Sequence, residues 1–154
     1  MYTGPMFKTS MLLLVVACAS LQAADGVIQN SAEISAVLSK ATANGGMKTA
    51  PVSIADQHRI NVVNRVSPGT PLTHPGNSEL HYVIDGAGTV VIGGEINRPS
   101  GATKDGQGAV IEGGQTRRVT KGDVVFVPSG MPHWYKEVEG SITYLEVRFE
   151  EGKK

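Results

Sequence analysis

The pattern of hydrophobic and polar positions changes its period once along the chain. From Ile34 to Ala41 the apolar residues recur at helical spacing, Ser31 can cap the helix, and Asn44-Gly45-Gly46 ends it. From residue 57 onward, short apolar or alternating runs are separated by turn residues, which is the pattern of strands with two different faces. The pattern therefore predicts one short helix followed by an all-β domain.

The predicted strands are short, and each is bounded by turn-forming residues. They cover residues 57–65, 79–84, 89–92, 109–112, 115–119, 123–127, 133–137 and 141–149. Asp85-Gly86 predicts a tight hairpin between the second and third strands. The polar, glycine-rich residues 95–108 predict a long loop. Many short strands at regular turn spacing indicate a β-sandwich or a barrel.

Composition agrees with this fold class and argues against a nucleic-acid-binding protein. A chain of 154 residues is long enough for one domain but short for two. Its 19 glycines suit a turn-rich β protein, and its 40% of hydrophobic residues is enough for a packed core. The formal net charge of zero argues against nucleic acid as a partner, because binding to phosphates needs a basic surface.

The beginning of the chain predicts a cleaved signal peptide over residues 1–23. Lys8 precedes a short apolar run at residues 11–17, and Leu21-Gln22-Ala23 suits cleavage before Ala24. The apolar run is too short to remain as a membrane-spanning helix. A periplasmic or secreted protein with no membrane segment after cleavage is therefore expected.

The single cysteine leaves a second processing route open. Val15-Val16-Ala17-Cys18 resembles the cleavage motif of bacterial lipoproteins, in which Cys18 becomes a lipidated first residue. If cleavage instead follows Ala23, the mature chain has no cysteine. In that case it contains neither a disulfide nor a thiol nucleophile.

Two segments carry histidine, glutamate, glycine and proline at defined spacing. In the first, His74 is followed after four residues by Glu79, and Glu79 after six more by Gly86. The second contains, in order, Gly122, Pro128, Gly130 and His133.

With both segments in this order, the sequence resembles the cupin superfamily, in particular its small single-domain members. The resemblance covers residues 57–149 and implies a small cupin-type β-barrel, also described as a double-stranded β-helix or jelly roll. Residues 24–56 are then an N-terminal arm with the short helix, and residues 150–154 are a charged tail.

The resemblance implies that His74, Glu79 and His133 bind one divalent transition metal inside the barrel. Imidazole and carboxylate ligands suit Fe, Mn, Ni, Zn or Cu. The fuller motif of the family has a further histidine at the position of Leu72, so the ligand set here has three members. Three protein ligands leave coordination positions open for water, dioxygen or substrate. A degenerate barrel without metal is the alternative.

His81 and Glu137 are the candidates for proton transfer. Side chains alternate along a strand, so His81 lies on the same face as Glu79. His81 could complete the ligand set, act as a base near the metal, or stay neutral and hydrogen-bonded in the barrel wall. Glu137 stands four residues after His133, where the family usually has asparagine.

The resemblance implies a metal-dependent enzyme of the dioxygenase, isomerase or lyase type that acts on a small organic molecule. The alternative is a non-catalytic cupin that binds a small ligand, with the metal structural or absent. A homodimer is also expected, because open sheet edges need cover and cupins commonly pair through the outer sheet face. Leu80, Tyr82 and Ile84 are the candidates for that contact.

Overall fold

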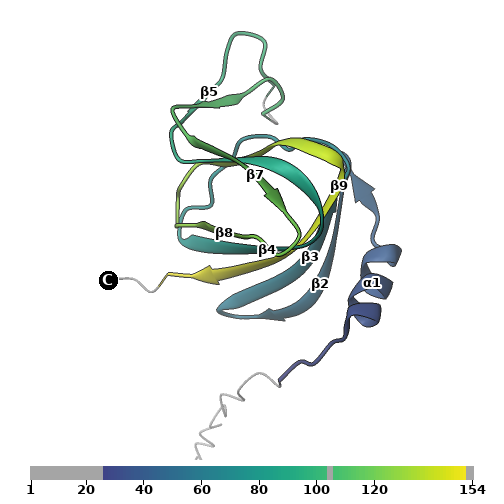
Figure 1. The fold of residues 1–154 in the computed structure, drawn as a ribbon. Coiled ribbons are helices and arrows are strands. Elements are labelled where there is room, and N and C mark those ends of the chain that lie inside the picture. Colours follow the sequence, from purple (N-terminus) through teal and green to yellow (C-terminus); the bar gives the residue numbers. More distant parts are fainter. Residues whose placement is uncertain (1–25, 104–105, 152–154) are drawn as a thin grey trace, which may run out of the picture.

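The computed structural model describes residues 26–103 and 106–151, which form one helix and nine strands (Figure 1). The elements are α1 (Ser31–Lys40), β1 (Ala43–Asn44), β2 (Met47–Ala55), β3 (His58–Arg65), β4 (Asn77–Ile92), β5 (Glu95–Asn97), β6 (Val110–Glu112), β7 (Gln115–Thr120), β8 (Val124–Val127) and β9 (His133–Glu150). The fold is all-β with a short N-terminal helix, so the predicted class is confirmed.

The predictions for the two ends of the chain fall largely outside the described residues. These are the signal peptide at residues 1–23, the lipoprotein cysteine Cys18, and residues 152–154 of the charged tail. Within the described part, no helix has the length and hydrophobicity that a membrane span requires.

Helix α1 is capped by Asn30 rather than by Ser31. The side-chain oxygen of Asn30 accepts hydrogen bonds from the backbone N–H groups of Ala32 at 2.9 Å and Glu33 at 3.1 Å. The Glu33 carboxylate accepts in return from the Asn30 N–H at 2.7 Å. This reciprocal capping box fixes the start of the helix, and the partly buried apolar side of α1 contacts β2 and β3.

The main sheet has seven strands and curves into a barrel (Figure 1). All paired strands are antiparallel, in the order β1-β2-β3-β9-β4-β7, and β8 also pairs with β4. β4 and β9 pair along nearly their whole length, from Asn77 opposite Glu150 to Ile92 opposite His133. The first half of β4 lies between β8 and β9, and its second half lies between β7 and β9. These two long strands therefore belong to both layers of the barrel.

The tight hairpin predicted at Asp85-Gly86 is wrong, because β4 continues through these residues. The register between β4 and β9 shifts between Val83 and Asp85. Gly86 has a φ of 76°, and a Cβ at this position would collide with the backbone oxygen of Ser141. Hairpin turns and β-bulges both use glycine at positive φ, so the local sequence does not distinguish them. Here the bulge bends β4 from one layer of the barrel to the other.

Three strands lie in segments that the sequence does not identify as strands, and the shortest of them, β1, pairs with β2. β2 occupies the end of the expected N-terminal arm and pairs with β3 from Met47 opposite Arg65 to Ala55 opposite His58. Its pattern is interrupted by Pro51, which lies at a register shift in the pairing. β5 lies in the expected loop at residues 95–108 and pairs with β6 in a separate two-stranded sheet.

The inside of the barrel has an apolar end and a polar end. Val63, Val83 and Ile142 are at most 1% exposed and belong to the apolar cluster. Along β4, every second side chain faces inward. These inward side chains are apolar at Val83 and polar at His81 and Glu79, nearer the start of the strand. Burying each large apolar side chain contributes about 1.5–3 kcal/mol to the stability of the fold. The apolar end therefore stabilises the barrel in which the polar groups are positioned.

Gly86→Ala is expected to destabilise the fold more than Gly93→Ala. The two glycines have nearly the same φ, 76° and 77°, so alanine at either position takes a backbone conformation that costs about 1–2 kcal/mol. At Gly86 the added methyl group also meets backbone, whereas nothing lies within 4 Å of it at Gly93. Equilibrium urea unfolding of both variants measures the difference, and an equal loss in the two would contradict the packing at the bulge.

Candidate metal centre

The polar end of the barrel is built from side chains that face inward from three neighbouring strands. Glu79 on β4 is directly opposite Arg148 on β9, and His81 and Glu146 form the next inward pair. Asn61 on β3 extends this second row, opposite Glu146. Because residues two apart on a strand share a face, these pairs enter the barrel together.

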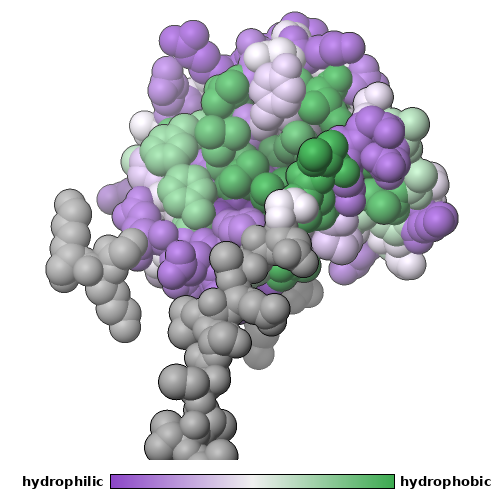
Figure 2. Space-filling view, turned by 90° about the horizontal axis from the view of Figure 1, so that it is seen from below, coloured by the Kyte–Doolittle hydropathy of each residue, from purple (hydrophilic) through white to green (hydrophobic). Residues whose placement is uncertain are grey.

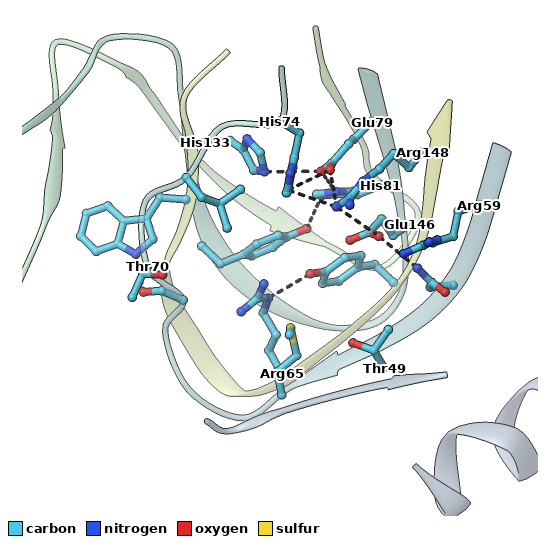
Figure 3. A pocket seen from close by; sticks show the side chains of 17 residues that line it. Thr49, Arg59, Arg65, Thr70, His74, Glu79, His81, His133, Glu146 and Arg148 are labelled. Atoms are coloured by element: carbon cyan, nitrogen blue, oxygen red, sulfur yellow. Dashed lines mark hydrogen bonds and ion pairs between the residues drawn. The ribbon is translucent and has the colours of Figure 1, made fainter. Parts of the chain in front are cut away.

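These side chains line a cavity of about 280 Å³ inside the barrel (Figure 3). The labelled histidines and Glu79 lie together at one end of the cavity, and Arg65 lies at the opposite end (Figure 3). Tyr135 and Tyr144 also line this cavity. The polar cluster is therefore accessible to a small molecule.

The structure brings together the three predicted ligands His74, Glu79 and His133. The segment with His74 is held against the start of β9 by two backbone hydrogen bonds between Leu72 and His133, of 3.1 and 3.0 Å. His74 Nε2 lies 3.2 Å from Glu79 Oε1, and His133 Nε2 lies 3.4 Å from Glu79 Oε2. One ligand atom from each residue lies within 4.8 Å of the other two, so the three can surround one metal ion.

Hydrogen bonds determine which ring nitrogens can act as ligands. His133 Nδ1 lies 3.1 Å from the carbonyl oxygen of Met131, which can only accept, so Nδ1 carries the hydrogen and the neutral ring directs its Nε2 lone pair at Glu79. His74 Nε2 accepts a hydrogen bond from Arg148 Nη2 at 3.1 Å, because a guanidinium has no acceptor. Two imidazole lone pairs and a carboxylate therefore converge, and this donor set fits a divalent transition metal.

His81 belongs to the same cluster, but its Nε2 carries a hydrogen, unlike Nε2 of His74 and His133. Its Nε2 lies 3.1 Å from Glu79 Oε2, and its Nδ1 lies 3.2 Å from the Tyr135 hydroxyl. An ionised carboxylate only accepts, so His81 Nε2 donates to Glu79, and Nδ1 shares a second hydrogen bond with the Tyr135 hydroxyl. In this arrangement His81 orients Glu79 and offers no lone pair to the centre of the cluster.

Arg148 places a positive charge beside the predicted ligands, and no motif in the sequence indicates it. Its Nη2 lies 2.6 Å from Glu79 Oε1 and 3.6 Å from Glu146 Oε1. The contact with Glu79 lacks hydrogen-bond alignment, so the buried Oε1 has no hydrogen-bond partner among the described residues. The guanidinium therefore balances the charge of Glu79 but leaves an oxygen lone pair for a metal.

The surroundings of Glu79 keep its carboxyl ionised. Burial by itself raises the pKa of Glu79, but the neighbouring His133 ring, the hydrogen bond from His81 and the charge of Arg148 outweigh it and hold the pKa well below its usual range. Burial lowers the pKa of His74, despite the opposing attraction of Glu79. A neutral imidazole beside an ionised carboxylate is the protonation state that binds a metal.

Two stacked tyrosines separate the polar cluster from the far end of the cavity. The ring centroids of Tyr135 and Tyr144 lie 4.9 Å apart. Burial raises the pKa of Tyr135 above its usual range and that of Tyr144 to about 12, so both hydroxyls stay protonated. Tyr144 accepts a hydrogen bond from Arg65 Nε at 2.9 Å. Arg65 and Tyr144 lie in strands where nothing in the local sequence distinguishes them from ordinary wall residues.

Glu137 is not brought to the other candidate residues. It is exposed, it does not line the cavity, and its carboxylate accepts a hydrogen bond from Thr89 at 3.0 Å. Thr89 is opposite Glu137 while Val90 is opposite Tyr135, so β9 has one extra residue at this point. That bulge reverses the alternation of faces, and Glu137 points outward although His133 and Tyr135 point inward.

Two further residues considered from the sequence, Leu72 and His58, have different positions relative to the cavity. Leu72 lines the cavity at the position of the absent histidine. His58 does not line it and contacts the Ser53 hydroxyl at 3.3 Å.

Comparison with known proteins assigns the fold. Residues 101–147 match the family model described as Cupin domain. No curated protein sequence matches the chain. The structure is similar to TT1209 from Thermus thermophilus, with 16% identity, a TM-score of 0.57, and coverage of 82% of this chain and 100% of that one.

Two further solved structures have similar scores. KdgF from Halomonas sp. is 18% identical, with a TM-score of 0.54 and coverage of 73% of this chain and 86% of that one. An oxalate decarboxylase of Bacillus subtilis with Mn(II) centres is 17% identical, with a TM-score of 0.54 and coverage of 77% of this chain but 30% of that one. At these identities the similarity concerns the fold.

The metal-free protein is expected to lose stability as the pH falls below about 4.5, in part because of Glu79. A carboxyl whose pKa is lowered by folding stabilises the folded state above its unfolded pKa, and this contribution disappears as the pH falls toward the folded pKa. Urea unfolding across the acidic range should show a shallower pH dependence for Glu79→Gln. Glu137→Gln is the control for removing one acidic group, and equal flattening in both variants would contradict the assignment.

Proposed function

We propose that the chain is a cupin that acts as an exported, metal-dependent enzyme. The match of residues 101–147 to the Cupin domain model and the similarity of the barrel to solved structures support this. One divalent transition metal is held by His74, Glu79 and His133, and the substrate is a small organic molecule. The sequence of residues 1–23 supports export to the periplasm or beyond the cell.

The observation that carries this proposal is the convergence of two imidazole lone pairs and a buried carboxylate at the end of a cavity. Because three protein ligands leave coordination positions free, a substrate in the cavity can reach the metal. The Mn(II) centres of the Bacillus subtilis oxalate decarboxylase support Mn, and Fe, Ni, Zn and Cu suit the same donors.

The bound metal would supply a Lewis acid that polarises a substrate oxygen. The protein supplies a hydrogen-bonded pair, the Tyr135 hydroxyl and His81 Nδ1, along which a proton can move beside the cavity. Glu79 stays ionised throughout, since its low pKa keeps it from competing for that proton. This set of groups suits an isomerase, a lyase or, with iron, a dioxygenase.

His133→Ala is expected to abolish binding of one equivalent of metal, whereas His58→Ala leaves binding unchanged. The first variant removes a converging lone pair, and the second removes a histidine outside the cavity.

The Arg148→Met variant should bind metal roughly tenfold or more tightly than the wild type, because like charges a few ångströms apart repel by several kcal/mol in a partly buried site. Elemental analysis and titration with Mn²⁺, Fe²⁺ and Zn²⁺ measure all three effects.

Turnover by the metal-loaded protein completes this test. A panel of small organic acids, enols and sugar derivatives is followed by NMR and by dioxygen consumption, with the His133→Ala variant as the blank. Circular dichroism confirms that each variant is folded. Equal metal binding by the His133→Ala and His58→Ala variants, or no metal binding by the wild type, would rule out the proposed centre.

Two observations favour a second candidate function, a non-catalytic cupin that binds a small ligand without metal. Arg148 already balances the charge of Glu79, and Leu72 takes the place of a fourth ligand. In that case ligand binding in the cavity persists after treatment with a chelator, and no metal raises the melting temperature.

We further propose that a second copy of the chain covers the outer face of β8, β4 and β9. Hydrophobic side chains gather on this side of the molecule (Figure 2). Val124 and Phe126 on β8 are 59% and 50% exposed, and they are paired with Tyr82 and Leu80 on β4. Exposed apolar patches of this kind are typical of interfaces. Ile84, also predicted to contribute, lies instead in the groove beside α1.

Phe126→Ser is expected to convert a dimer into a monomer, because it removes an exposed aromatic group from this face. Val66→Ser is the matched control, since Val66 is 60% exposed but lies in the turn after β3. Light scattering at micromolar concentration gives the mass of each variant. A monomeric wild type, or dissociation by both substitutions, would contradict the assignment.

A further inference from the structure

Three arginines line the cavity, and they differ in how their charges are balanced. Arg148 is paired with Glu79 and Glu146. Across the described residues, Arg59 and Arg65 make no ion pair with an acidic side chain. A cation at a cavity wall without an acidic partner favours an anionic ligand, because the ligand supplies the missing charge.

Arg65 is fixed at the end of the cavity opposite the candidate metal centre (Figure 3). Its Nε donates to the Tyr144 hydroxyl at 2.9 Å, and its guanidinium carbon lies 5.4 Å from the centroid of the Tyr135 ring. On another side it packs against Gly69, where an added Cβ would lie 2.9 Å from Nη1. In the part of the chain that the structure describes, neither Nη1 nor Nη2 has a hydrogen-bond acceptor. The guanidinium is thus held in place with its terminal donors unused.

Arg65 also lies where the cavity joins a groove on the surface. The groove, of about 770 Å³, shares Arg65, Met47, Leu72 and Trp134 with the cavity. Trp134 is held there by the hydrogen bond from its Nε1 to the carbonyl oxygen of Gly69, of 2.8 Å. A molecule that enters from the groove therefore passes an apolar wall and a free guanidinium before it reaches the polar cluster.

We propose that Arg65 binds the carboxylate of a small organic acid whose other end lies at the candidate metal centre. The contact at the metal rests on the proposed function, whereas the contact with Arg65 does not. The planar donors of a guanidinium match the two oxygens of a carboxylate, and the apolar wall suits a short carbon chain. Phosphate fits less well, because phosphate sites usually combine several donors, whereas Arg65 offers a single guanidinium.

Binding of succinate to the full mature chain tests this assignment by isothermal titration calorimetry. The wild type should bind succinate at millimolar concentrations or below, and Arg65→Gln should weaken binding about tenfold or more. Arg65→Lys should restore part of the affinity, because it returns the charge without the planar donors. Arg117→Gln is the matched control, since Arg117 is exposed on β7 and does not line the cavity.

Several results would overturn the proposal. They are the absence of succinate binding by the wild type, equal binding by the Arg65→Gln variant, equal binding of the neutral diamide succinamide, and tighter binding of inorganic phosphate. Loss of binding in Arg59→Gln but not in Arg65→Gln would place the anion at the other unbalanced arginine and would also overturn it. Circular dichroism shows whether each variant is folded, and the Arg65→Lys variant separates loss of charge from loss of packing at Tyr144.

The same titration with and without Mn²⁺ separates this proposal from the proposed function. If succinate binding depends on Arg65 in both states while no metal binds, the metal-dependent function fails and the carboxylate site stands. If metal binds to the wild type and the Arg65→Gln variant still binds succinate as the wild type does, the carboxylate site fails and the metal centre stands.

Discussion

Glu79 is 1% exposed inside the barrel, and the neighbouring polar groups are arranged around its carboxylate. A carboxylate can be buried only where charges and hydrogen bonds replace the water that it loses. His81 supplies a hydrogen bond, and Arg148 supplies a charge. Antiparallel pairing of β4 with β9 places Arg148 directly opposite Glu79, so the strand register that forms the barrel also forms the site.

This arrangement makes Arg148 important in two opposite ways. In the metal-free protein its guanidinium lies beside Glu79 and His74 and stabilises a buried negative charge. The same positive charge disfavours a metal ion at the ligands that converge there. The affinity of this site for a metal and the stability of the metal-free barrel would therefore both depend on the side chain of Arg148.

The cavity has different chemistry at its two ends. At one end the lone pairs of His74, Glu79 and His133 favour a cation, and at the other end the free donors of Arg65 favour an anion. The stacked rings of Tyr135 and Tyr144 lie near both ends, since Tyr135 contacts His81 and Tyr144 contacts Arg65. A bifunctional organic acid, with a carboxylate and a second oxygen function, complements both ends.

The sequence predicted what depends on local pattern and on spacing. The helix at α1, most strands of the barrel and the all-β class follow from periodicity and turn residues, and the placement of His81 on the same face as Glu79 follows from strand alternation. The resemblance of the two motifs to those of the cupin superfamily implied that His74, Glu79 and His133 come together, although the residues lie far apart in the chain.

The tertiary structure decided what depends on pairing between strands. The bulge at Gly86 replaces a hairpin, and the extra residue in β9 turns Glu137 outward. Arg65 and Arg148 reach the cavity because β3 and β9 face inward at those positions, and their own sequence neighbourhood contains no signal for this. A bulge shifts all following side chains to the opposite face, and its position is fixed by contacts with the partner strand rather than by the residues at the bulge itself.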